Sequence, residues 1–313
     1  MARSPFEPDR DQTAIAKAYK NQRFIADEAL PRIAVDMRDY EYKEYDLSAG
    51  FTVPNTLVGR KSRVNQTEFP YSTIKRTCED FGIEDPVPVF DMSRQQDGGQ
   101  RLIRRTTEML TNIIMLDREM RVANLVFDAA QYPADNKVSL AGTDVFDNPS
   151  VDPLDVVMEG MKKLFIRPNT VAFGYDAYLA FRRNPNVVKA VNGTSGDKGL
   201  VRRDQIAQLL EVDNVLVGES HMNVSRPGQT PTLEHIWGPH MAMYFLDPLG
   251  APDGPPSFGW TAEFDGRVAG TRKDDTIGLR GAEVVRVGES VDEVLAAPML
   301  GYLIENAGAE YTG

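Results

Sequence analysis

The sequence contains few of the side chains that most often perform catalysis or bind metal ions. Its 313 residues include one cysteine, Cys78, and three histidines, His221, His235 and His240. A single cysteine excludes an internal disulfide and fits a reducing cytoplasm, and no base lies near it in the sequence, so we expect a packed side chain. His235 and His240 flank a Gly-Pro turn at a spacing that matches no recognised zinc pattern, so we expect structural histidines.

The chain also lacks the apolar segments of exported and membrane proteins. Residues 1–10 contain no signal-like apolar run, and no stretch approaches the ~20 apolar residues that cross a bilayer. We therefore expect the sequons at Asn65, Asn192 and Asn223 to be chance matches.

An excess of basic residues is absent too. The net charge of −11 argues against a surface that binds phosphate. It still permits a container for nucleic acid, because the lining of a container needs only to avoid adhering to its contents.

Sequence motifs of enzymes are missing. The segment GTSGDKG at Gly193–Gly199 lacks the adjacent Gly-Lys-Ser/Thr of a phosphate-binding loop, so we expect a mobile loop. Neighbouring acids, such as Asp274 with Asp275 or Glu79 with Asp80, are too common in an acidic chain to identify an acid/base pair. We predict no catalytic, cofactor-binding or metal-binding residue, no cofactor and no enzymatic activity.

The first eighty residues have no obvious core of their own. Residues 11–29 form a short amphipathic pattern, which is either a frayed end or an arm that packs on its own body or on a neighbouring subunit. Alternating apolar and polar residues at 33–37 and 40–45, a polar tip at 46–66 and a return at 69–76 predict one long hairpin. A projecting aromatic hairpin needs a partner that covers it.

Residues 100–131 predict one very long helix, because neither Gly nor Pro interrupts them. At 1.5 Å per residue this helix extends roughly 45 Å. Its apolar stripe is predicted to consist of Leu102, Met109, Ile113, Leu116, Met120, Ala123 and Phe127.

The rest of the chain alternates helix and strand signals, which favours a compact α/β lobe within an α+β protein. The predicted helices are residues 154–165, 174–183 and 204–210. The predicted strands are residues 171–173, 214–218, 235–246, 258–264, 282–287 and 302–306.

This order of arm, hairpin, long helix, lobe and late strands resembles the major capsid proteins of tailed bacteriophages. Local phrases add to the resemblance: YSTIKRTCEDFGIEDPV, VAFGYDAYLAFRRNP, VLVGESHMN and WGPH with PSFGW. These proteins share the Hong Kong 97 fold with encapsulin shells. The resemblance implies an N-terminal arm (1–37), an extended loop (38–80), a peripheral domain (81–132 and 255–295) with a spine helix (100–131), and an axial domain (133–254 and 296–313).

The resemblance further implies a function. Copies of the chain would form the pentamers and hexamers of an icosahedral head that encloses double-stranded DNA, assembled in the bacterial cytoplasm with portal, scaffolding or decoration proteins. Gly193–Gly199 would face the capsomer centre. Some relatives link subunits through a Lys-Asn bond; Lys43 and Lys61 lie in the loop, but we expect no such link. The alternatives are an encapsulin-like compartment and an α/β enzyme whose pocket lies where the lobe meets the late strands.

Overall fold

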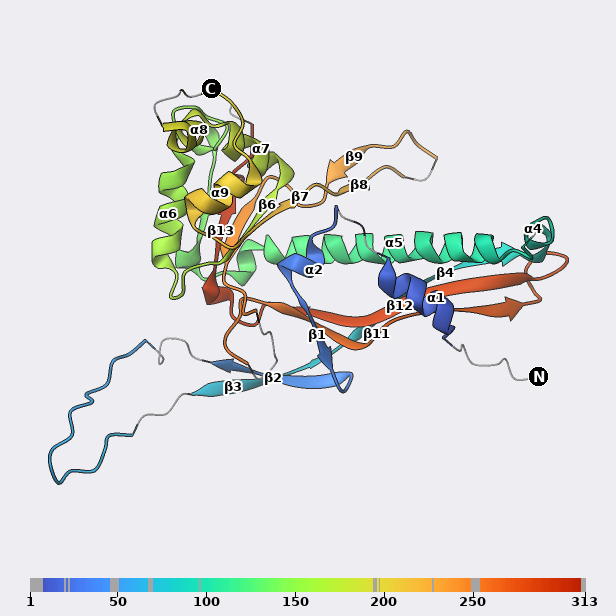
Figure 1. Cartoon of the computed structure of the whole chain (residues 1–313), viewed down its shortest axis with the longest axis horizontal. Helices are drawn as coiled ribbons and strands as arrows, with labels where there is room; N and C mark the ends of the chain where they lie inside the picture. Colours follow the sequence, from blue (N-terminus) through green and yellow to red (C-terminus); the bar gives the residue numbers. More distant parts are fainter. Residues whose placement is uncertain are drawn as a thin grey trace.

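The computed structural model describes residues 8–19, 21, 23–45, 51–66, 70–95, 97–193, 196, 198–226, 228–248 and 254–310. Figure 1 shows a rounded lobe from which a long helix extends over long strands, while a hairpin projects from the other side. The predicted α+β class is confirmed. No helix among the described residues is long and apolar enough to span a membrane.

A four-stranded sheet of unusual length lies beneath the long helix. Its strands, in spatial order, are β1 (Arg32–Val35), β11 (Trp260–Asp274), β12 (Ala282–Val294) and β4 (Glu79–Pro88). β1 runs parallel to β11, and the other neighbours are antiparallel. The predicted strands at 258–264 and 282–287 were too short, and β4 was not predicted. The sequence Asp265-Gly266 is typical of a turn, but here both residues have positive φ and form a β-bulge inside β11.

The long helix α5 (Gln100–Val126) has 27 residues, about 40 Å, and packs on β12 and β4. It ends before the predicted residue 131, where a short 3₁₀ turn, Ala129–Gln131, follows. Two of the seven residues predicted for the apolar stripe are exposed, so the prediction was wrong for them: Met109 is 58% exposed and Ile113 is 46% exposed. The buried face contains Ile103, Thr106, Thr107, Leu110, Thr111, Ile114, Met115, Arg118, Glu119, Val122, Ala123 and Val126.

The predicted N-terminal helix is two short helices, α1 (Arg10–Ala18) and α2 (Ala26–Ala29). α1 packs on β11 and α5, with Ala16 fully buried. The Asp9 amide donates a hydrogen bond to the Ala269 carbonyl at 2.9 Å. Where the structure describes it, the arm therefore packs on its own body, and the frayed-end alternative was wrong.

The lobe contains a five-stranded mixed sheet with helices around it (Figure 1). Its strands, in spatial order, are β5 (Lys137–Ser139), β13 (Gly301–Glu305), β10 (Met241–Tyr244), β6 (Thr170–Gly174) and β7 (Asn214–Gly218). Its helices are α6 (Pro153–Lys163), α7 (Tyr175–Arg183), α8 (Pro185–Asn192) and α9 (Arg203–Leu210). All of β6 is buried, and the Phe173 and Phe181 rings lie 5.4 Å apart in the core. The α/β lobe predicted from alternating signals is confirmed.

Two small hairpins and several short turns complete the described chain. The hairpins are β2 (Asp39–Tyr45) with β3 (Tyr71–Thr77), and β8 (His221–Asn223) with β9 (Leu233–His235). The short helical elements are α4 (Val89–Ser93), η2 (Ala134–Asn136), η3 (Gly142–Asp144) and η5 (Pro298–Leu300). The predicted strand 235–246 is in fact β9 and β10, separated by the turn around Gly238, whose φ is +55°.

A buried ionic cluster joins the arm to the long sheet and to α5. Glu289 on β12 is 3% exposed and lies 3.0 Å from Arg32 and 3.1 Å from Arg267. Arg118 of α5 pairs with Asp27 of the arm and donates hydrogen bonds to the Leu30 carbonyl and to Thr261. Burial alone raises the pKa of Glu289, but the two arginines outweigh it and lower that pKa below its usual 4.5.

The next residue of α5, Glu119, binds the arm and also Trp237. Its side chain is fully buried and accepts hydrogen bonds from the Ile25 and Ala26 amides, both at 2.9 Å. It also accepts one from the Trp237 indole at 2.6 Å. Burial raises the pKa of Glu119, while these hydrogen bonds and Arg118 oppose the rise.

The close approach of Trp237 to β7 yields a stability prediction. A Cβ added at Gly218 would lie 2.1 Å from the rigid, fully buried Trp237 ring. We expect Gly218→Ala to lower the unfolding free energy of the unassembled subunit by about 1–3 kcal/mol or more in urea titrations. Gly82→Ala is the matched strand control, because its nearest contact is 3.5 Å, and we expect little change. Equal stability of the two variants would contradict the packing described.

The ionic cluster predicts a pH effect. A lowered carboxylate pKa stabilises the fold above pH 4.5, and that contribution disappears as the pH falls through the folded-state value. We expect Glu289→Gln to cost about 3–5 kcal/mol at pH 7, because it leaves buried arginines uncompensated, and to flatten the loss of stability below pH 4.5. The control Glu84→Gln removes a partly exposed pair with Arg286 and should cost under about 1 kcal/mol. Urea titrations from pH 3 to 7 measure both; an unchanged acid slope in Glu289→Gln would reject the assignment.

Candidate assembly surfaces

The structure brings two of the three histidines together. His221 and His235 are directly opposite on β8 and β9, with ring centroids 4.1 Å apart, and the Tyr175 ring lies 4.8 Å from His235. Burial, and then His221, lower the pKa of His235. His240 lies elsewhere, where its Nδ1 accepts a hydrogen bond from the Asn306 amide at 3.1 Å. No cluster of three or more His, Cys, Asp or Glu that could hold a metal occurs within the described part of the chain.

The other candidate residues are parts of local structure. Cys78 is fully buried, and burial raises the pKa of its thiol to about 11, so its nucleophilic thiolate is scarce at neutral pH. Asp274 accepts hydrogen bonds from Arg272 and Thr276 in a turn, and Asp80 pairs with Arg38 at 3.0 Å. In the loop predicted at Gly193–Gly199, residues 194, 195 and 197 lie outside the described residues.

A pocket of about 410 Å³ lies between the arm and the lobe, near the place where an enzyme would need its site. It contains Glu28, Arg32, Asp213 and Asp247, but no His, Cys, Ser or Lys among the described residues that line it. Its charged groups are therefore three carboxylates and one guanidinium.

The base of the β2–β3 hairpin is fixed to the long sheet by aromatic packing. Tyr40 and Tyr42 are 7% and 5% exposed, and both ring centroids lie 5.6 Å from Trp260 of β11. The Tyr40 hydroxyl donates to Asp292 at 2.7 Å, and Arg76 donates two hydrogen bonds to the same carboxylate. Burial, and then Asp292, raise the pKa of Tyr40. The hairpin was predicted to expose its aromatic residues; at its base they are buried, so that prediction was wrong there.

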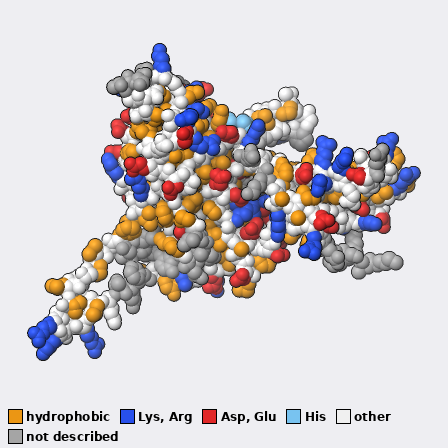
Figure 2. Space-filling model, in the orientation of Figure 1, with side chains coloured by type: hydrophobic (Ala, Val, Ile, Leu, Met, Phe, Trp, Pro, Cys, Tyr) orange, Lys and Arg blue, Asp and Glu red, His pale blue; other side chains and the backbone are white. Residues whose placement is uncertain are grey.

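The tip of the hairpin has the opposite character. Residues 51–66 form no strand or helix, and all are exposed. The exposed large apolar residues are Phe51, Val53, Leu57, Val58 and Val64. Arg60, Lys61 and Arg63 are the charged residues of this tip, and no acidic residue accompanies them. Figure 2 shows this basic group at the far end of the projecting loop, in a chain of net charge −11. Such a surface fits a partner that is acidic and offers apolar contacts.

The hairpin base yields a third prediction. Tyr40→Phe removes a hydrogen bond to a carboxylate but keeps the ring, so we expect a loss of about 1.5–3 kcal/mol in urea unfolding of the subunit. Tyr42→Phe is the matched control, because its ring packs on the same tryptophan and no hydrogen bond of its hydroxyl occurs among the described residues. We expect a change under about 0.5 kcal/mol there. If both variants lose the same free energy, the hydrogen bond from Tyr40 to Asp292 does not stabilise the hairpin base.

Relatives and solved structures identify the family of this molecule. The chain is 44% identical over 309 residues to the "Major capsid protein" of Pseudomonas phage JBD67, covering 99% of this chain and 100% of that protein. It is 26% identical over 304 residues to the "Major capsid protein" of Burkholderia phage BcepMu, covering 93% and 94%. No protein-family model matches the sequence.

Solved structures show the same fold. A phage-related protein from Bordetella bronchiseptica RB50 has a TM-score of 0.76 at 21% identity, covering 98% of this chain and 100% of that one. A putative capsid protein from a prophage of E. coli CFT073 has a TM-score of 0.59 at 10% identity, covering 96% and 99%. The Hong Kong 97-type fold is therefore confirmed, as is the prediction of a structural protein and not an enzyme. The chain belongs to the major capsid proteins of bacteriophages, which assemble with copies of themselves into the shell of the virion.

Proposed function

We propose that this protein forms the pentamers and hexamers of the icosahedral head of a tailed bacteriophage, and that this head encloses double-stranded DNA. The support is the full-length similarity to two phage capsid proteins together with the capsid fold. Shell formation takes place in the cytoplasm of the host bacterium. Portal, scaffolding or decoration proteins are the further partners of such a shell.

The proposed assembly mechanism rests on the exposed apolar residues of the hairpin tip. A loop that exposes five large apolar residues finds no apolar surface for most of them within its own chain. A second copy supplies both the apolar contacts and the negative charge, since each copy is acidic overall. Residues 38–80 accordingly act as the extended loop that lies over a neighbouring subunit.

One apolar cluster lies within a single domain of the proposed division, a second lies within the other domain apart from Ala16 of the arm, and a third joins the arm, α5 and the lobe. One apolar cluster fills the lobe, around residues such as Phe146, Phe181 and Ile206. A separate one, around Val87, Ile103 and Val285, lies between α5 and the long sheet. We assign residues 1–37 to the arm, 81–132 and 255–295 to the peripheral domain, and 133–254 and 296–313 to the axial domain, which meets its copies at the five- and six-fold positions.

The DNA inside such a head is held without sequence-specific contacts. A chain of net charge −11 does not neutralise phosphates as a nucleic-acid-binding protein does. An encapsulin-like compartment is built from the same fold and differs in its contents. Both relatives above are named as phage capsid proteins, which favours the phage head.

A fourth prediction tests the hairpin tip. Leu57 is 83% exposed, so Leu57→Asp should leave the subunit folded, yet it should lower the yield of closed shells at least tenfold, because the charge would be buried at every subunit contact. The neighbouring Thr56→Asp adds the same charge at an exposed polar position and should assemble nearly normally. Gradient sedimentation and electron microscopy count the shells.

A deletion makes the test independent of one side chain. Removal of residues 48–65 should give a folded subunit that fails to close shells. Normal shells from both Leu57→Asp and the deletion would remove the hairpin from the assembly mechanism. If the unaltered protein stayed monomeric or dimeric under all assembly conditions and no virion contained it, the capsid function itself would be lost.

A further inference from the structure

A turn at the far end of the long sheet exposes a large apolar side chain at its apex. The turn joins β11 to β12, and Leu279 within it is 99% exposed. Gly278 and Gly281 on either side have φ of +65° and +79°, which few other residues adopt. The Val89 amide of α4 donates a hydrogen bond to the Gly281 carbonyl at 3.1 Å and attaches the turn to the helix. The leucine is therefore presented on a defined turn.

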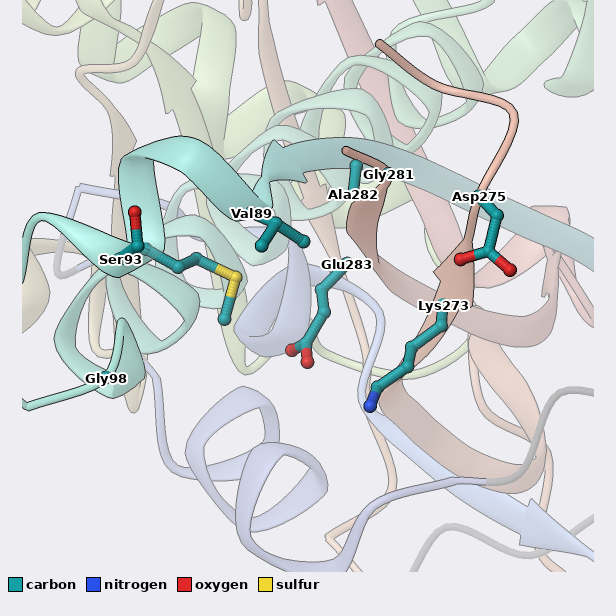
Figure 3. Close-up of a pocket in the computed structure, with 9 residues that line it drawn as sticks. Val89, Ser93, Gly98, Lys273, Asp275, Gly281, Ala282 and Glu283 are labelled. Carbon is teal, nitrogen blue, oxygen red and sulfur yellow. The ribbon is translucent and has the colours of Figure 1, made fainter. Parts of the chain in front are cut away.

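A pocket lies at the same end of the sheet. It has a volume of about 320 Å³, the lower end of the ~300–1,000 Å³ typical of ligand sites, and is open to solvent. Val89, Met92 and Ala282 give it an apolar part. Figure 3 shows the side chains of Val89, Lys273 and Glu283 extending toward the same space. The pocket thus fits a short aliphatic side chain and leaves polar groups at its edge.

The chain's own leucine does not fill this pocket, because a side chain inside it would not be 99% exposed. The guanidinium of the next residue, Arg280, lies 5.8 Å from the centre of the Phe90 ring of its own chain. The pocket edge provides the carboxylates of Asp275 and Glu283 and the ammonium of Lys273. A leucine followed by an arginine, from another molecule, matches an apolar floor whose edge carries two carboxylates and one ammonium. Leu279 with Arg280, and the pocket that would accept such a pair, lie at the same end of each chain.

We propose that Leu279 of one copy inserts into the pocket formed by Val89, Met92 and Ala282 of the next copy, so that the ends of the long sheets join subunits in a ring. The contact is head-to-tail: each copy supplies a leucine to one neighbour and a pocket to the other, and a rotation axis closes the ring. Arg280 then lies beside the neighbour's Asp275 and Glu283. The inference rests on the proposed shell function and assigns one of its contacts.

A variant series at the leucine tests the contact. Because Leu279 contacts almost nothing within the chain, substitutions there should leave the melting temperature of the subunit within about 2 °C. Leu279→Asp and Leu279→Asn should each lower shell yield tenfold or more, since neither fills an apolar pocket. Leu279→Met keeps an apolar side chain of similar size and should assemble within about twofold of the unaltered protein. The asparagine variant separates loss of apolar contact from repulsion by an added charge.

Cysteine pairing tests the geometry directly. The natural Cys78 is fully buried, so an introduced surface cysteine is the reactive thiol. Shells are co-assembled from two variants, Leu279→Cys and Val89→Cys, one of which carries a tag that changes its mass, and are then oxidised. A disulfide between these positions can form only between two chains, and it requires Cα atoms about 4.4–6.8 Å apart. We expect a mixed dimer on non-reducing gels, while each variant assembled alone gives little dimer.

The outcomes are distinct. Normal shell yield from Leu279→Asp and Leu279→Asn, with no mixed dimer, would overturn the proposed contact while the shell function stands. Dimers from Leu279→Cys alone, in place of mixed dimers, would also overturn it, because the leucines would then meet each other. Failure of the unaltered protein to assemble would instead reject the proposed function.

Discussion

Two adjacent residues in the middle of α5 determine how the whole chain is held together. Successive helix positions point about 100° apart, so Arg118 and Glu119 face different neighbours. Arg118 binds Asp27 of the arm and Thr261 of the long sheet, and Glu119 accepts hydrogen bonds from the arm and from Trp237 beside the lobe. Buried charges are costly unless fully paired, so few other arrangements of arm, sheet and lobe satisfy both side chains. Helix, sheet and lobe accordingly pack as one unit.

This unit places the two proposed contact surfaces at separated ends. The hairpin loop projects from one end of the molecule, and α4 with the β11–β12 turn lies at the other (Figure 1). A helix of 27 residues packed along β4 and β12 keeps the distance between the ends nearly constant. A closed shell requires subunits of fixed dimensions. Small errors in the placement of each contact would otherwise accumulate from subunit to subunit.

The sequence showed that α5 exists, but it did not show which face is buried. A run of residues without Gly or Pro and with frequent Leu and Met predicts a helix whatever it packs on. The buried face, however, includes Arg118 and Glu119, whose burial depends on partners far away in the sequence. It also includes Thr107 and Thr111, whose hydroxyls bond to backbone carbonyls four residues earlier. Met109 and Ile113 therefore seemed to belong to the core stripe, although they are exposed. Ion pairs between residues that are far apart in the sequence produce no periodic pattern in the residues around them.

The β2–β3 hairpin, too, could be predicted only in part from the sequence, and the part that could not be predicted bears on assembly. Its strands were predictable from alternation, but the burial of Tyr40 and Tyr42 depends on Trp260, more than two hundred residues away. Its base is therefore stabilised by its own chain, and its tip, residues 51–66, is exposed and available for the neighbour proposed above. An anchored base reduces the conformational entropy that the tip loses on docking, so a small contact becomes sufficient. A subunit that made several such contacts at once would build a stable shell from individually modest interfaces, while single wrong contacts could still dissociate during assembly.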